Sequence, residues 1–324
     1  MFGRKRSGGT KLRLFFTTDV HGSDQCFAKF VNAAAAYSAQ VLVLGGDITG
    51  KRVVPIVRRG TGWVATMGAG DVRMTTEAEI TAFEKDAGNA GLYAFRASDD
   101  DVAELETGEA AVDAVFLRLA RLRLERWLTL AEQRLAGTGV QLFVNCGNDD
   151  PFELDDLLRS SPLAVFPEGR TIAIDERRAL VSVGFANETP WHCPRDTSET
   201  DLARRIEAAL GDRPAGGELI FNLHCPPYDS GLDLAPKLTA EMSTVMEAGQ
   251  PVVAPVGSTA VRAAIEQHQP LLSLHGHIHE GRGVVNIGRS VVINPGSEYP
   301  DGILRGALID LDGSGIKGYV LTSG

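Results

Sequence analysis

Carboxylate, amide and imidazole side chains recur in this sequence directly after short apolar runs. Asp19 and His21 follow the apolar residues 12–18, and Asp47 follows residues 41–44 and a Gly-Gly pair. Oxygen and nitrogen ligands of this kind bind divalent cations, and two cations held about 3.5 to 4 Å apart can activate a water and clamp phosphoryl oxygens. The candidate ligands are Asp19, His21, Asp47, Asn148, His224, His277 and His279.

The geometry of β-strands predicts that these side chains converge. Asp19 and His21 lie two positions apart after the first run, so the alternation of side chains along a strand directs both the same way. Gly46 permits the tight turn that brings Asp47 close to its neighbours. His277 and His279 alternate in the same manner. We therefore expect four strand ends and one loop to supply the whole ligand set.

Largely apolar runs of strand length alternate in this chain with segments of helical periodicity. Such a pattern is typical of strands buried on both faces in a layered α/β fold, where ligands gather at the strand ends. The predicted buried strands are 12–18, 41–44, 142–144, 219–223 and 271–274. The predicted helices are 24–38, 76–89, 111–135, 199–210 and 258–268, with N-caps at Asp24 and Ser258. Short runs at 291–293, 307–311 and 318–321 predict consecutive antiparallel strands that complete a sheet.

A long segment separates the second and third of these strands. Residues 50–138 include a Gly-rich stretch, 59–70, which surrounds Trp63. This stretch predicts a β-hairpin followed by helices, which we expect to cap one end of the sheets. The acidic residues 99–101 are expected at a solvated helix start. The 324 residues thus predict one domain, 1–324, with an inserted cap.

Composition bounds the function classes. With 44% hydrophobic residues the chain can bury a large core, and its net charge of -10 disfavours a nucleic-acid partner. The basic residues 4–6 precede no apolar run of secretory length, and no run is long enough to span a bilayer, so we expect a cytoplasmic protein without a membrane partner. A homo-oligomer is compatible with these observations. The cysteines lack a paired spacing and are expected as buried free thiols: Cys26, Cys146, Cys193 and Cys225.

The order of these motifs resembles that of the calcineurin-like metallophosphoesterases, whose pattern is D-x-H, G-D, G-N-H-[DE], an isolated His and G-H-x-H. The corresponding residues here are Asp19-Val20-His21, Gly46-Asp47, Gly147-Asn148-Asp149-Asp150, His224 and Gly276-His277-Ile278-His279. Four further segments look like those of the Icc-related predicted phosphoesterases: Thr189-Pro190-Trp191, His224-Cys225-Pro226-Pro227, the stretch 276–283, and Asn294-Pro295-Gly296-Ser297.

The resemblance implies a four-layer α/β/β/α sandwich of two mixed β-sheets and a pair of divalent metal ions. It implies that Asp19, His21, Asp47 and His279 bind the first metal, whereas Asp47, Asn148, His224 and His277 bind the second. The implied reaction is hydrolysis of a small phosphodiester, phosphomonoester or nucleotide through a metal-bridging hydroxide. We expect Mn²⁺, with Fe, Zn²⁺ or Co²⁺ as alternatives, because the ligand set has no thiolate.

Asp149 departs from the family pattern, because it stands where many members place the histidine that protonates the leaving group. A carboxylic acid beside two cations is a weak proton donor. We therefore expect a preference for aryl esters or nucleotide phosphates, with His192 as the substitute acid. Substrate contacts are expected from Asn148, Arg195, Arg282 and Trp63.

Two other functions fit parts of the pattern. A nuclease of the same superfamily would use the same metals, although the acidic charge and a capping insertion disfavour bulky chains. A catalytically silent metal-binding scaffold would use the fold for interaction, but such proteins lose ligands, and every expected ligand is present in this sequence.

Overall fold

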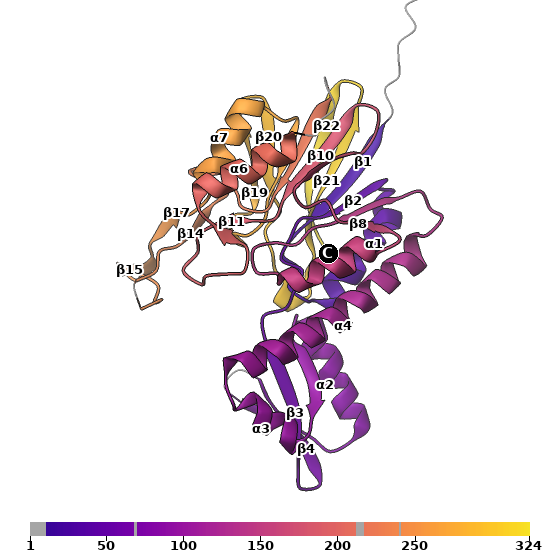
Figure 1. Ribbon diagram of the computed structural model, residues 1–324, viewed down its shortest axis with the longest axis vertical. Helices are drawn as coiled ribbons and strands as arrows, with labels where there is room; N and C mark the ends of the chain where they lie inside the picture. Colours follow the sequence, from indigo (N-terminus) through magenta and orange to yellow (C-terminus); the bar gives the residue numbers. More distant parts are fainter. Residues whose placement is uncertain (1–10, 68–69, 212–216, 240) are drawn as a thin grey trace, which may run out of the picture.

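The computed structural model describes residues 11–67, 70–211, 217–239 and 241–324, and the basic residues 4–6 lie outside these ranges. The chain forms a mixed α/β protein (Figure 1). The described helices are α1 (Asp24–Tyr37), α2 (Glu77–Asn89), α3 (Asp99–Leu105), α4 (Glu109–Leu135), α5 (Asp155–Ser160), α6 (Glu199–Leu210) and α7 (Thr259–His268). Within these ranges no helix combines the length and the apolar character needed to cross a bilayer.

Two large mixed sheets carry the predicted strands. The first has the order β22 (Gly315–Ser323), β21 (Arg305–Asp312), β1 (Leu12–Thr17), β2 (Val41–Leu44), β7 (Gln141–Val144) and β8 (Ala164–Val165). The second has the order β10 (Arg178–Val183), β13 (Glu218–Leu223), β18 (Leu272–Leu274), β20 (Ser290–Asn294) and β19 (Gly283–Ile287). The strands β1, β2 and β7 pair in parallel, and so do β10, β13, β18 and β20.

One expectation about the C-terminal strands is wrong. The strands β21 and β22 are antiparallel neighbours, as predicted, but the run 291–293 belongs to β20, which pairs in parallel with β18 in the other sheet. Short apolar runs do not show to which sheet they belong, because a parallel and an antiparallel partner bury the same residues.

Apolar side chains from the two sheets meet in one buried cluster. Its members include Leu14, Phe16 and Val43 of the first sheet and Leu180, Ile220 and Ile293 of the second. The outer face of the first sheet is covered by α1 and α4, where the rings of Phe27 and Trp127 stack with centroids 4.3 Å apart. The outer face of the second sheet packs against α6 and α7. Each fully buried apolar side chain contributes about 1.5 to 3 kcal/mol to folding.

The observed N-caps of α1 and α7 lie within one residue of the predicted positions. Ser258 caps α7, and its side chain accepts a hydrogen bond from the amide of Val261, as expected. Ser23 rather than Asp24 caps α1, and Asp24 is the first helical residue. The acidic residues 99–101 begin α3, after a capping box formed by Ser98 and Asp101.

The insertion is richer in strands than predicted. Its sheet has the order β5 (Gly70–Met74), β4 (Gly62–Met67), β3 (Val53–Arg59) and β6 (Tyr93–Ala97). The predicted hairpin is β3 and β4, but β3 also pairs in parallel with β6, across the helix α2. This sheet has a small core of its own, and Figure 1 shows β3, β4, α2 and α3 together at the lower end of the molecule.

Short elements complete the fold. They are the strands β9 (Arg170–Ala173), β11 (Ala186–Asn187) with β12 (Asp196–Thr197), β14 (Leu234–Pro236) with β17 (Val253–Pro255), and β15 (Met246–Glu247) with β16 (Gln250–Pro251). Two single 3₁₀ turns cover Phe152–Leu154 and Tyr299–Asp301.

Candidate metal centre

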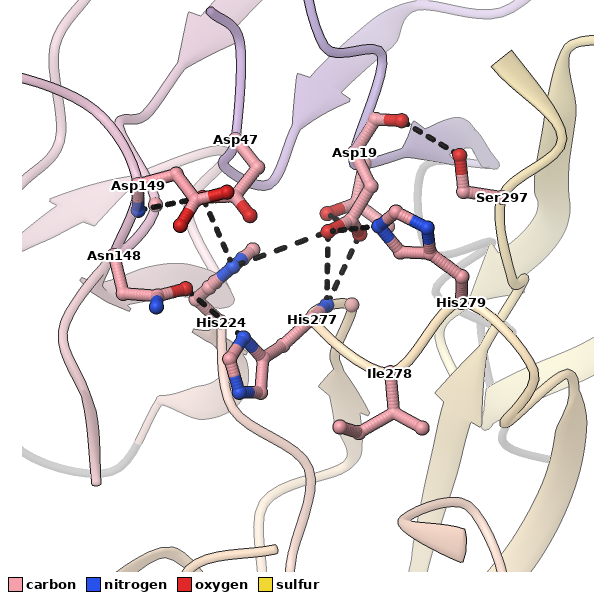
Figure 2. A network of polar contacts seen from close by, with 12 residues as sticks. Asp19, Asp47, Asn148, Asp149, His224, His277, Ile278, His279 and Ser297 are labelled. Carbon is pink, nitrogen blue, oxygen red and sulfur yellow. Dashed lines mark hydrogen bonds and ion pairs between the residues drawn. The ribbon is translucent and has the colours of Figure 1, made fainter. Parts of the chain in front are cut away.

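The carboxyl ends of five parallel strands, β1, β2, β7, β13 and β18, deliver polar side chains to one place (Figure 2). Because neighbouring parallel strands end at the same edge of a sheet, residues far apart in sequence meet there. Figure 2 shows the side chains of Asp19, Asp47, Asn148, His224, His277 and His279 converging.

The side chains form two groups, each able to hold one cation. Candidate ligand atoms of Asp19, His21 and His279 lie within 4.8 Å of one another, and so do those of Asp47, His224 and His277. In the first group His279 Nε2 lies 3.5 Å from Asp19 Oδ1. In the second, His224 Nε2 lies 3.3 Å from Asp47 Oδ1. Asn148 joins the second group, since its Oδ1 lies 2.9 Å from His277 Nδ1.

Asp47 connects the two groups. Its Oδ2 lies 3.7 Å from His21 Nε2, while its Oδ1 faces His224. A carboxylate with one oxygen toward each group has the placement that a bridging ligand of two cations requires.

The buried imidazole of His224 shows that these residues fit metal ions. Neither of its ring nitrogens has a hydrogen-bond partner of acceptable geometry, although Nε2 approaches Asp47. The side chain is fully buried. Leaving a buried polar nitrogen unpaired costs about 1 to 3 kcal/mol, and a cation at this position would satisfy the nitrogen of His224 that faces Asp47. Mixed imidazole, carboxylate and amide ligands suit a first-row transition metal.

Four of the ten non-glycine residues with positive φ in the described part of the chain are candidate ligands. Asp19 has φ 51, His21 has φ 37, Asp47 has φ 50 and His277 has φ 65. Residues other than glycine rarely adopt positive φ, and such residues cluster at functional sites. Asp19 and His21 therefore converge through a left-handed loop after β1, and not through the strand alternation expected from the sequence.

Glycines next to the ligands permit the close approach. A Cβ atom at Gly46 would lie 2.5 Å from His224 Nδ1, and one at Gly147 would lie 2.1 Å from Asp47 Oδ1. Any larger residue at either position would push a candidate ligand out of place. This role of Gly46 was expected from its place before Asp47.

Partners behind the ligands fix their orientation. His21 Nδ1 lies 3.2 Å from the carbonyl oxygen of Thr49, which leaves Nε2 facing the site. The amide of Asn148 donates from Nδ2 to Asp196 Oδ1 at 3.0 Å, so that its carbonyl oxygen faces His277. Asp196, the first residue of β12, was not recognised in the sequence, although it directly follows the predicted substrate contact Arg195.

Asp150 is a buried carboxylate behind the site that accepts four hydrogen bonds. It accepts hydrogen bonds from the amides of Ile48 at 3.0 Å, Thr49 at 2.8 Å and Gly147 at 2.7 Å. The hydroxyl of Thr49 donates to it at 2.7 Å. Asp150 thus ties the loop that carries Asp47 to the loop that carries Asn148. The motif Gly147-Asn148-Asp149-Asp150 contains Asp150, but the spacing of the motif does not show whether Asp150 binds a metal or holds the loops in place.

The loop 189–195 lies against Asp149. The thiol of Cys193 donates to Asp149 Oδ1 at 2.8 Å, and Lys51 Nζ forms an ion pair with Asp149 Oδ2. Asp149 also belongs to a third group of candidate ligand atoms, with His21 and Asp47. His192, the predicted acid, is exposed on this loop with φ 52.

Three of the predicted substrate contacts lie in different surroundings. Arg195 is 1% exposed, and its guanidinium donates to Asp155 Oδ1 at 2.5 Å and to the carbonyl oxygen of Asp150 at 2.9 Å, so it supports the fold instead of facing a phosphate. Trp63 packs in the insertion, in a hollow that it shares with Arg96, and is not brought to the ligands. Arg282 is exposed, beside Gly296.

Without metal, protons balance the charge of the site. Burial lowers the pKa of His224, but the negative charge of Asp47 outweighs this effect, so that the pKa of His224 is raised to about 9. Burial lowers the pKa of His21 to about 3 and that of His277 to about 4. For Asp47, burial is outweighed by the positive charge of His224 close beside it, which holds the pKa of Asp47 well below the usual range.

Metal affinity should therefore increase with pH. Below pH 9 a cation must displace the proton of His224, so we expect Mn²⁺ affinity to rise about tenfold per pH unit for each proton displaced between pH 6.5 and 8.5. Isothermal titration calorimetry in buffers of different ionisation enthalpy measures both the affinity and the proton release. An affinity independent of pH, without proton release, would contradict the assignment of His224 as a ligand.

Comparisons with known proteins agree with the α/β fold and name no activity. No protein-family model matches the sequence. The chain is 26% identical over 167 residues to the uncharacterized protein MJ1162 of Methanocaldococcus jannaschii, a match that covers 50% of this chain and 68% of that protein. One solved structure covers 97% of this chain and 99% of its own, with a TM-score of 0.55 at 16% identity. The structure of TT1561 of Thermus thermophilus has the same coverage and identity, with a TM-score of 0.50.

Proposed function

We propose that this protein is a phosphoesterase of the calcineurin-like type that uses two divalent metal ions. The observation that carries the proposal is the pair of ligand groups joined by Asp47, with the orphaned imidazole of His224 buried between them. Two cations held by these residues would supply a nucleophilic water at neutral pH and would neutralise the phosphoryl oxygens.

The protein's own residues hold and orient the reacting parts. Asp19 and Asp47 contribute negative charge that compensates the cations, and the imidazoles fix their positions. Asn148 is a neutral ligand whose carbonyl oxygen is aimed by Asp196. The partly buried carboxylate of Asp149 lies at the edge of this set, and so does the loop that carries Cys193.

The proposal extends to the fold family. The packing of helices on the outer faces of two sheets, with an apolar cluster between the sheets, supports a four-layer α/β/β/α sandwich. The motifs shared with the Icc-related predicted phosphoesterases support a place in that group. In this view residues 1–324 form one domain, in which the segment 50–138 contributes α4 to the outer face of the first sheet and adds a small sheet with its own core, in place of the expected cap.

The proposed substrate is a small phosphomonoester, phosphodiester or nucleotide, and the proposed metal is Mn²⁺, with Fe, Zn²⁺ or Co²⁺ as alternatives. The acidic net charge of -10 argues against a nuclease. The retention of every ligand argues against a silent scaffold, because a scaffold needs no strained backbone at Asp19, Asp47 and His277.

Metal content separates the enzyme from the scaffold. After loading with Mn²⁺ and removal of free metal, we expect inductively coupled plasma mass spectrometry to find about two ions per chain, as a dinuclear site requires. His224→Ala should retain about one ion, because the group around Asp19 keeps its ligands. His192→Ala is the matched control and should retain both ions, because His192 belongs to neither group. Protein that takes up no metal would refute the proposed function.

A further inference from the structure

We propose that Lys51 is a catalytic residue of this site, whose ammonium contacts the leaving-group oxygen of the phosphoester. The inference rests on the proposed function, and it names a residue outside the motifs that led to that function. It follows from the contact of Lys51 with Asp149 and from the rigid loop on which Lys51 stands.

Lys51 lies at the edge of the ligand groups. Its Nζ forms an ion pair with Asp149 Oδ2, and a carboxylate oxygen of Asp149 lies within 4.8 Å of candidate ligand atoms of His21 and Asp47. The carboxylate of Asp149 therefore lies between the ammonium of Lys51 and the candidate metal ligands. Its side chain is 47% exposed, so a substrate entering from solvent can reach it.

The backbone before Lys51 is fixed on both sides. The amide of Gly50 donates to the hydroxyl of Tyr93 at 2.9 Å, and a Cβ atom at Gly50 would lie 2.1 Å from the carbonyl oxygen of Gly91. The amide of Thr49 is held by the buried Asp150. Lys51 thus projects from a segment held between the insertion and the loop of Asp150, so the fold sets the position of its backbone, and the ion pair with Asp149 locates its ammonium. A fixed position is what a catalytic donor needs.

Two other charged side chains near the site already have partners within the protein. The guanidinium of Arg195 is buried against Asp155, and the carboxylate of Asp149 is ion-paired with Lys51 and accepts a hydrogen bond from the thiol of Cys193. In the part of the chain that the structure describes, Lys51 is the only Lys or Arg side chain that forms an ion pair with a residue of the three candidate ligand groups. It is therefore the cation best placed to stabilise charge that develops outside the metals.

The chemical step defines what Lys51 does. A water oxygen forms the new bond to phosphorus, the bond from phosphorus to the leaving oxygen breaks, and both electrons of that bond stay on the leaving oxygen. The Lys51 ammonium donates a hydrogen bond to this oxygen while its charge develops. The proton that the leaving alcohol finally carries comes from the attacking water. Asp149 positions the ammonium and is not itself the donor.

Leaving-group dependence tests this role. Lys51→Met should lower kcat/KM for an alkyl monoester, glycerol 2-phosphate, about a hundredfold, since an alkoxide needs strong stabilisation. The same change should lower kcat/KM for p-nitrophenyl phosphate less than about fivefold, because p-nitrophenolate leaves without help. Lys51→Arg should restore most of the alkyl activity. The matched control is Arg52→Met, which removes an exposed cation from the neighbouring position and should change neither rate.

A binding measurement separates this inference from the proposed function. Inorganic phosphate places an oxygen where the leaving group sits, so calorimetry on Mn²⁺-loaded Lys51→Met should show phosphate affinity about tenfold lower, with unchanged metal content. Equal losses on both esters, or phosphate affinity equal to that of the unsubstituted protein, would overturn the role of Lys51 and leave the metal site intact. If the unsubstituted protein hydrolyses neither ester, the proposed function fails, and the phosphate affinities alone decide whether Lys51 contacts an oxyanion.

Discussion

Replacing Asp47 by alanine should abolish metal-dependent phosphoester hydrolysis, with a loss of at least about a thousandfold in kcat/KM. Asp47 directs one oxygen toward His21 and the other toward His224, so its removal takes a ligand from both groups at once. The loop that carries it remains tied to Asp150 through the amides of Ile48 and Thr49, so the fold should persist.

The Asp47 variant can be measured with bis-p-nitrophenyl phosphate and p-nitrophenyl phosphate after Mn²⁺ loading. Asp47→Asn keeps the size of the side chain but removes its charge, and it should lose nearly as much activity. Asp100→Ala is the matched control, because Asp100 is an exposed carboxylate on α3. If Asp47→Ala retained a tenth or more of the activity, Asp47 could not be a shared ligand.

Replacing Asp150 by alanine should destabilise the fold by about 3 to 5 kcal/mol, because four buried donors lose their acceptor. The donors are the amides of Ile48, Thr49 and Gly147 and the hydroxyl of Thr49. The same change releases the two loops from each other, so metal binding should weaken even at temperatures where the protein stays folded. Urea unfolding and calorimetric metal titration measure the two effects.

Asp156→Ala serves as the control for Asp150. Asp156 is a nearby carboxylate whose side chain is 87% exposed and which pairs only with Arg159 at the surface. Its removal should change the free energy of unfolding by less than about 0.5 kcal/mol. Equal stability of the Asp150 and Asp156 variants would show that the buried network does not hold the two loops together.

The sequence was sufficient to select the candidate ligands that the structure brings together, because they stand at strand ends. Each run that predicted a buried strand is a strand in the structure, and Asp19, Asp47 and His224 lie where those strands stop. Periodicity carries this information, since apolar runs of strand length and polar residues after them are visible locally. The left-handed backbone at Asp19 and Asp47 was not visible, because neither residue type requires it.

The supports of the site were less accessible to sequence analysis. Asp150 and Asp196 act through hydrogen bonds to residues brought near only by the fold, and an acidic residue in a loop is most often solvated. The contact of Lys51 with Asp149 was not visible in the sequence either, because the fold brings together two residues far apart in the chain. Trp63 was expected near the site because the insertion was expected to cover it, whereas the parallel pairing of β3 with β6 gives the insertion a core that holds Trp63.

The most direct test of a two-metal phosphoesterase is hydrolysis of bis-p-nitrophenyl phosphate and p-nitrophenyl phosphate by metal-stripped protein, before and after Mn²⁺ is added back. We expect no turnover without metal, turnover of at least one ester with Mn²⁺, and loss of that turnover in Asp47→Ala. Absence of turnover with Mn²⁺, Fe, Zn²⁺ and Co²⁺ in turn, from protein that binds two ions per chain, would refute the phosphoesterase and leave a metal-binding protein without this activity.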